Sequence, residues 1–183
     1  MARPPAARAK VLDAYLSLLC DEGERAATME AIAAKAGVSK GGLLYHFASK
    51  DALAEALIES CEQLVLEDLE LMAAAEEGAA VYFVRTSAEY NTDYDRHLVA
   101  MHRLAQAGVA GAVAQIESTE TRWLQLLIED MEDENLARMV MLMGEGLYAY
   151  ASMPGGWYER NFDGSLPQLL QLVPHLKKLS SIN

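Results

Sequence analysis

The sequence predicts an all-helical (all-α) protein with a small N-terminal part, residues 1–50, and a larger helical body, residues 51–183. Two observations predict this fold class. Apolar residues recur at intervals of three and four along most of the chain, and helix caps or glycines separate these stretches. Apolar residues make up 52% of the chain and charged residues 23%, which is typical of a folded globular protein.

The first two helices are predicted from their caps and stops. The first begins just after a Pro-Pro pair, runs to about Asp21 and is stopped by Gly23. Thr28 is a good N-cap for a second, short helix, which Gly37 ends. The two helices are therefore joined by a short connection.

A third and a fourth helix follow after tight turns. Ser39 caps the third helix, which has about two turns and closes at Phe47. Ser49 caps the fourth, a long helix over about residues 49–75 that connects the two parts of the chain. The predicted inward stripe of this helix consists of Leu53, Leu57, Cys61 and Leu64.

Five more helices are predicted in the body, at about residues 79–90, 93–107, 109–131, 134–152 and 165–179. The helix at 134–152 is apolar on nearly every side, and such a helix must be buried all round. In a small protein this is possible if one face lies in the core and another in a subunit interface. Gly144 and Gly146 would allow close packing there.

The formal net charge of -12 is unevenly distributed. Residues 1–50 hold seven basic and five acidic residues, whereas residues 51–183 hold eight and 22. Between Ala31 and Lys50 there are three lysines and no acid. Contact with a polyanion is therefore confined to the N-terminal quarter, and the alternative is that these lysines are ordinary solvated side chains.

Several classes of protein lack support in the sequence. No HExxH, GxSxG, P-loop or paired-cysteine zinc motif occurs, so we expect no enzyme, no metal site and no cofactor. Cys20 and Cys61 are far apart and indicate free thiols in a reducing compartment. No signal peptide is visible and no apolar run reaches about 20 residues, which predicts a soluble, cytoplasmic protein.

The two short helices, backed by the first, predict a helix-turn-helix. The second helix of such a unit enters the major groove of DNA and presents its N-terminal side chains to base edges. Glycines let DNA approach the backbone, tyrosine and histidine donate to phosphates, and helix N-termini attract anions. The predicted DNA-binding residues are Thr28, Ser39, Lys40, Gly41, Gly42, Leu43, Tyr45, His46 and Lys50. Val38, Leu44 and Phe47 are predicted to be core residues.

The segment TMEAIAAKAGVSKGGLLYHFASKDALAEAL, residues 28–57, resembles the DNA-binding segment of the TetR/AcrR family of transcriptional regulators. The matching positions are Thr28, Ile32-Ala33, Ala36-Gly37-Val38-Ser39, Gly41, Leu43, Tyr45, Phe47 and Ser49-Lys50-Asp51. The resemblance covers about residues 6–60. One departure is that Gly42 replaces a hydroxyl residue, so a phosphate or base contact is missing. Leu44 is an extra leucine where the family's aromatic often begins.

The resemblance implies a ligand-responsive transcriptional regulator, most often a repressor. Each subunit of a homodimer would read one half of a near-palindromic operator in double-stranded DNA, and the helices at about 134–152 and 165–179 would form the dimer interface. A small molecule bound in the body would favour a state in which the fourth helix has swung and the DNA is released. The alternative is a helical protein-interaction module that uses the helix-turn-helix only for packing.

Methionines and aromatic residues gather in the body, where regulators of this family bind their ligands. Six of the nine methionines lie between residues 101 and 153, and methionine is an adaptable lining for apolar guests. The candidate ligand-binding residues are Tyr90, Tyr94, Met101, His102, Trp123, Met139, Met143, Glu145 and Tyr148. The same spacing is also that of plain core. Glu145 predicts a cationic ligand and His102 an anionic one, and both alternatives stay open.

Overall fold

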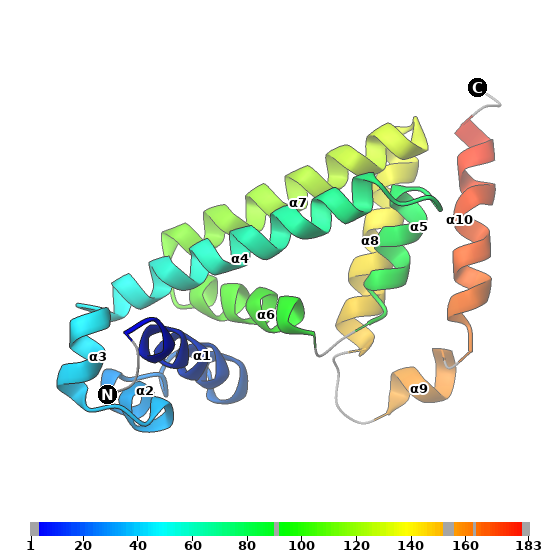
Figure 1. Cartoon of the computed structure of the whole chain (residues 1–183). Coiled ribbons are helices and arrows are strands. Elements are labelled where there is room, and N and C mark those ends of the chain that lie inside the picture. The colour runs from blue at the N-terminus through cyan, green and yellow to red at the C-terminus, as the bar shows by residue number, and fades with distance from the viewer. Residues whose placement is uncertain (1–3, 90–91, 152–155, 163, 181–183) are drawn as a thin grey trace. The chain divides into compact units, whose positions relative to one another are not determined.

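The computed structural model describes residues 4–89, 92–151, 156–162 and 164–180, and within them it contains ten helices and no strand (Figure 1). The helices are α1 (Pro4–Glu22), α2 (Met29–Ala36), α3 (Lys40–His46), α4 (Lys50–Ala73), α5 (Ala79–Thr86), α6 (Asp93–Gln106), α7 (Ala110–Met131), α8 (Glu134–Ala151), α9 (Trp157–Phe162) and α10 (Leu166–Ser180). The predicted fold class is confirmed.

Two elements differ from the predicted ones. α5 ends at Thr86 and not near residue 90, and the amide of the next residue, Ser87, closes the last turn by donating to the Phe83 carbonyl at 3.0 Å. α9 was not predicted, because its six residues, WYERNF, are too few to show a helical period. Stacked rings join its two ends, since Tyr158 and Phe162 have centroids 5.4 Å apart.

The described helices fall into two compact units. The first comprises Met1–Val65 with Asp93–Ser118, and the second comprises Leu66–Thr92 with Thr119–Asn183. These units are defined by packing, whereas the division at residue 50 follows the motif. α4 and α7 each contribute residues to both units.

The first unit is built around α1, which packs on α2, α3 and α6. Its core is made of aliphatic and aromatic side chains at helical spacing, so each helix turns one apolar face inward. The fully buried members include Val11, Tyr15, Leu19, Ile32, Leu43, Leu53 and Leu57. Arg96 of α6 donates to Ser17 Oγ at 2.7 Å, and the Cys20 thiol donates to the Arg96 carbonyl at 3.2 Å. These two bonds join α6 to the back of α1.

The second unit brings α5, α8 and α10 side by side (Figure 1). A β-carbon added at Gly144 of α8 would overlap the Phe83 ring and lie 2.8 Å from Ser87 Oγ, so glycine is required where α8 meets α5. Gly146 differs, because a β-carbon added there meets nothing within 4 Å. The close packing predicted for these glycines is thus found at Gly144 within one subunit.

None of the described helices combines the length and the apolar character that crossing a membrane requires.

Candidate functional site

The N-termini of α2, α3 and α4 each carry a hydroxyl cap. Thr28 Oγ1 accepts from the Ala31 amide at 3.2 Å, and Ser39 Oγ accepts from the Gly42 amide at 3.1 Å. The Ser49 hydroxyl caps α4 in the same way, at 3.1 Å from the Ala52 amide. The hydroxyl oxygens are used as acceptors, so each hydroxyl proton remains to donate to an acceptor outside the protein.

The turn between α2 and α3 depends on one glycine. Gly37 has φ 68° and ψ 33°, the left-handed conformation that a side chain disfavours. Its amide donates back to the carbonyls of Ala33 and Ala34, which ends α2. The chain then changes direction within a few residues, and this change sets the direction of α3.

The burial of the two leucines of α3 is the reverse of what was predicted. Leu43, predicted to contact DNA, is 0% exposed, whereas Leu44, predicted to be core, is 43% exposed. The helical period explains this: Leu43 and Phe47 are four apart and share the buried side, and Leu44 is turned about 100° away from them. Tyr45 beside it is 82% exposed.

The two glycines of α3 also differ. A β-carbon added at Gly41 meets nothing within 4 Å, whereas one at Gly42 would lie 3.3 Å from Ser39 Oγ and 3.8 Å from Val38 Cβ. Gly42 therefore faces the turn, and Gly41 faces open space. Since helix-favouring alanine would fit at Gly41 in the isolated protein, the protein's own packing does not require glycine there.

The two predicted lysines have carboxylate partners within the protein. The Lys40 ammonium pairs with Glu30, and both side chains are well exposed. Lys50 is more enclosed: its ammonium lies 2.6 Å from Glu24 Oε1 and donates to the Glu24 carbonyl at 2.9 Å. Lys50 thereby ties the α1–α2 connection to the start of α4, a structural role that the sequence did not reveal.

His46 lies at the end of α3 and is half-buried. Its ring contacts the Tyr45 ring edge to face, with centroids 5.1 Å apart. The predicted residues Tyr45 and His46 thus form one aromatic pair on this helix.

The family comparison matches the helix-turn-helix. Residues 11–57 match the family described as bacterial regulatory proteins, tetR family. The likeness to this family thus covers the helix-turn-helix of the chain. No curated protein sequence matches it.

Solved structures share the fold of the whole chain, including its helical body. Salmonella enterica GusR is 19% identical with a TM-score of 0.66, covering 97% of this chain and 98% of its own. A γ-butyrolactone receptor, an ArpA-like protein, is 21% identical with a TM-score of 0.61, over 97% and 99%. SCO7518 from Streptomyces coelicolor A3(2) is 26% identical with a TM-score of 0.62, over 94% and 99%.

The match over the helix-turn-helix supports a DNA-binding transcriptional regulator, and regulators of the tetR family are non-enzymatic. In the part of the chain that the structure describes, no group of three or more His, Cys, Asp or Glu side chains is arranged to hold a metal ion. The surface of α3 around Tyr45 is the first candidate for contact with DNA, because α3 is the second helix of the helix-turn-helix.

The nine candidate ligand-binding residues are divided between the units. Tyr94, Met101 and His102 belong to α6 in the first unit, and Tyr90 lies outside the described residues. The remaining five, in the second unit, are Trp123, Met139, Met143, Glu145 and Tyr148. Met101 is fully buried, whereas Met139 is exposed. Their role in ligand binding stays a prediction.

A polar group inside the second unit was missed by the sequence reasoning. Asp68 of α4 accepts from Trp123 Nε1 at 3.1 Å and from the Tyr82 hydroxyl at 3.0 Å. Phe83 packs edge-on against Trp123, with ring centroids 5.6 Å apart. The sequence analysis did not single out Asp68, although it lies four residues after Leu64, on the predicted inward stripe.

The environment of this network raises the pKa of two of its groups, Asp68 and Tyr82. Burial raises the pKa of the Asp68 carboxyl, and the hydrogen bonds from Trp123 and Tyr82 oppose this rise without cancelling it. Burial, followed by the negative charge of Asp68, raises the pKa of Tyr82 to about 12. The surroundings of Asp68 therefore disfavour its charged form.

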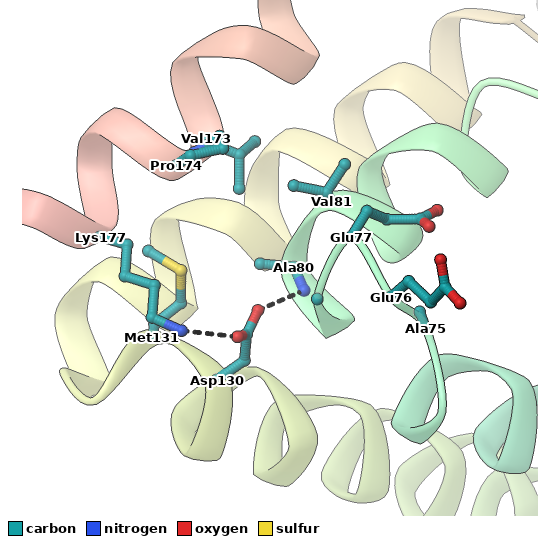
Figure 2. A pocket seen from close by; sticks show the side chains of 11 residues that line it. Ala75, Glu76, Glu77, Ala80, Val81, Asp130, Met131, Val173, Pro174 and Lys177 are labelled. Carbon is teal, nitrogen blue, oxygen red and sulfur yellow. Dashed lines mark hydrogen bonds and ion pairs between the residues drawn. The ribbon is translucent and has the colours of Figure 1, made fainter.

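A pocket of about 320 Å³ lies in the second unit near the start of α5, the end of α7 and α10 (Figure 2). Asp130 lines this pocket and accepts two hydrogen bonds, from the Ala80 amide at 2.9 Å and from Lys177 Nζ at 2.8 Å. Asp130 thereby caps α5, whose preceding residue, Gly78, has no side chain to do so. None of the candidate ligand-binding residues lines this pocket, and its charged groups stabilise a helix junction.

Proposed function

We propose that this TetR-family regulator is a repressor that binds a near-palindromic operator as a homodimer and leaves it when a small molecule binds. The observation that carries the proposal is the geometry of α3. Leu43 fixes one side of the helix in the core, while Tyr45 on the other side is left almost fully exposed. A short, rigidly held helix with an exposed aromatic suits the major groove.

In the proposed complex, polar groups of α2 and α3 position the protein on phosphates. The hydroxyls of Thr28 and Ser39 donate their protons to phosphate oxygens, as do Tyr45 and His46. Lys40 is exposed and can exchange its pairing with Glu30 for a phosphate, because an exposed ion pair contributes little to stability. These contacts provide affinity without sequence preference.

The remaining predicted residues contribute in other ways. Gly41 lets the DNA backbone approach α3, whereas Gly42 maintains the turn that orients the helix. Lys50 holds the helix-turn-helix together through Glu24 and adds its positive charge near the DNA. Leu43 acts only as core.

Apolar side chains on α8 and α10 support a dimer of two identical subunits. Leu142 of α8 is 73% exposed, and Met139 of the same helix and Leu172 of α10 are also exposed. Leu142 lies three residues after Met139 and four before Gly146, so the three form one stripe. Exposed apolar patches of this kind mark interaction sites. In the dimer, Gly146 would let the partner's backbone approach.

The dimer would set the operator geometry. Each subunit contributes one α3, and two such helices placed about 34 Å apart meet successive major grooves on one side of the DNA. A protein with twofold symmetry then selects a near-palindromic sequence.

Release would follow from a shift between two states. α4 carries Leu53 in the core of the first unit and Asp68 in the interior of the second, so one continuous helix takes part in both. A small molecule that binds the second unit better in the released state shifts the population towards it. A γ-butyrolactone receptor has the same fold, and this supports a small organic molecule as the effector.

The first test is selection of genomic DNA fragments by the purified protein at about 0.15 M salt, where non-specific binding is weak. Tyr45→Ala serves as the control. We expect a near-palindrome to be enriched by the native protein and not by the variant. No enrichment by a folded dimer, with and without cell extract to supply an effector, would favour a protein-interaction module.

The second test concerns release. Candidate small molecules are titrated into the free protein and into the protein–operator complex. We expect weaker binding to the complex, because a molecule that lowers the affinity for DNA must itself be bound less tightly when DNA is present. Equal affinity for both forms of the protein would rule that molecule out as the releasing effector.

A further inference from the structure

The chemistry of α3 restricts how it can read bases. In the major groove, guanine is usually recognised by Arg or Lys, adenine by Asn or Gln, and cytosine by Glu or Asp. Residues 39–47, Ser-Lys-Gly-Gly-Leu-Leu-Tyr-His-Phe, contain none of these except Lys40. The segment that faces the groove therefore offers little hydrogen-bonding readout, and some other contact must supply sequence preference.

Leu44 is the apolar group placed to do this. It is 43% exposed on a helix whose neighbouring leucine is fully buried, so its exposure results from its position on the helix and not from loose packing. Gly41 lies three residues before it on the same side, and open space surrounds Gly41. A close approach of DNA at Gly41 would bring the Leu44 methyl groups near the base edges.

We propose that Leu44 is a specificity-determining residue that recognises thymine by contact with its 5-methyl group. Thymine is the base that presents a methyl group in the major groove, and apolar side chains recognise it there. Burying Leu44 against that group also removes from water an apolar side chain that the free protein exposes. The inference rests on the proposed operator binding and adds the chemistry of one base contact.

The test uses the DNA fragment that the native protein enriches, with each thymine replaced in turn by uracil. This change removes only the methyl group and keeps the base pairing. We expect one or two positions in each half-site at which native protein loses roughly three- to ten-fold in affinity, the effect of about one buried methyl group. Leu44→Ala should bind the thymine fragment more weakly and show no further loss with uracil at those positions.

Leu71→Ala is the matched control, because Leu71 is an exposed leucine of α4 outside the helix-turn-helix. It should keep the full response to uracil, and thermal unfolding should show that both variants are folded. The proposal is overturned if native protein is indifferent to uracil at every position, or if Leu44→Ala keeps the native response. Failure of operator binding itself would be recognised earlier, because no fragment would be enriched.

Discussion

The helices α3 and α8 both expose large apolar side chains, and they differ in what surrounds those side chains. On α3, Leu44 and Tyr45 are exposed next to Gly41, within a stretch from 31 to 50 that has three lysines and no acid. Lys40 and Lys50 pair with Glu30 and Glu24, which lie outside that stretch, so a polyanion at this surface competes with these two carboxylates for the lysines. The apolar groups of α3 are therefore suited to the base edges inside a negatively charged groove.

The exposed face of α8 has a different character. Leu142 and Met139 lie on a helix where Arg138 pairs with Glu134 at 2.7 Å, so these two charges neutralise each other along the helix. Such a surface is suited to a second apolar surface, and not to a polyanion. The comparison teaches that exposure alone does not define a binding site, because the neighbouring charges determine which partner can cover it.

The largest expected effect comes from breaking the α8 surface. Leu142→Glu should turn the proposed dimer into a monomer, because a carboxylate would be buried in the interface without a partner. A single subunit holds one half-site, so affinity for the full operator should fall by roughly 10²- to 10⁴-fold. Light scattering and DNA binding measure the two effects, and thermal unfolding shows that the variant is folded.

Leu71→Glu is the control for that substitution, because Leu71 is a similarly exposed leucine on a different helix. It should remain dimeric and keep its affinity for the operator. Should Leu142→Glu also remain a dimer, α8 would not be the interface, and the comparison between the two helices would fail.

The next effect separates the two glycines of α8. Gly144→Ala should destabilise the protein by about 1–3 kcal/mol, because its β-carbon would overlap the Phe83 ring. Gly146→Ala should not destabilise an isolated subunit, since its β-carbon meets nothing within 4 Å. Denaturant unfolding measures both. Weaker dimerisation of Gly146→Ala with normal folding would add evidence that α8 is covered by a partner.

Comparing the two faces also shows how far the sequence predicts this protein. The helix-turn-helix was predicted residue by residue, because Thr28, Gly37 and Ser39 act locally through caps and a turn. The sequence analysis did not predict that Leu43 is buried and Leu44 exposed. Both leucines are apolar, and only the packing of α3 on its neighbours decides which one is buried.

In the body the prediction was coarser for a physical reason. The helices followed from their periodicity, but side chains such as Asp68 and Trp123 meet only through packing of residues far apart in sequence. Methionines and aromatics have the same pattern whether they form core or line a ligand site. The pairing of Lys50 with Glu24 was missed for the same reason.

A smaller effect tests the open side of α3. Gly41→Ala should raise the stability of the free protein by up to about 1 kcal/mol, because alanine favours the helix. It should weaken operator binding by roughly ten-fold or more if DNA lies against this side, since overlap with one methyl group costs on the order of 1–3 kcal/mol. Leu71→Ala, which changes an exposed side chain of α4 outside the helix-turn-helix, is the control and should leave contact with DNA unchanged. A Gly41→Ala protein with native affinity would place the DNA elsewhere.

The smallest effect concerns the polar network of Asp68 in the second unit. The native protein should gain stability relative to Asp68→Asn as the pH falls from about 7 towards 4. The reason is that burial raises the pKa of Asp68, so the folded state takes up its proton before the unfolded state does. Urea unfolding of both proteins across this pH range gives the difference, and subtraction cancels the carboxylates common to both. A difference that stays flat would mean that the bonds from Trp123 and Tyr82 balance the cost of burial, and a reversed difference would mean that they outweigh it. In that case Asp68 would stabilise the second unit as a charged group, and neutralising it would weaken the packing of α4 against α5 and α7.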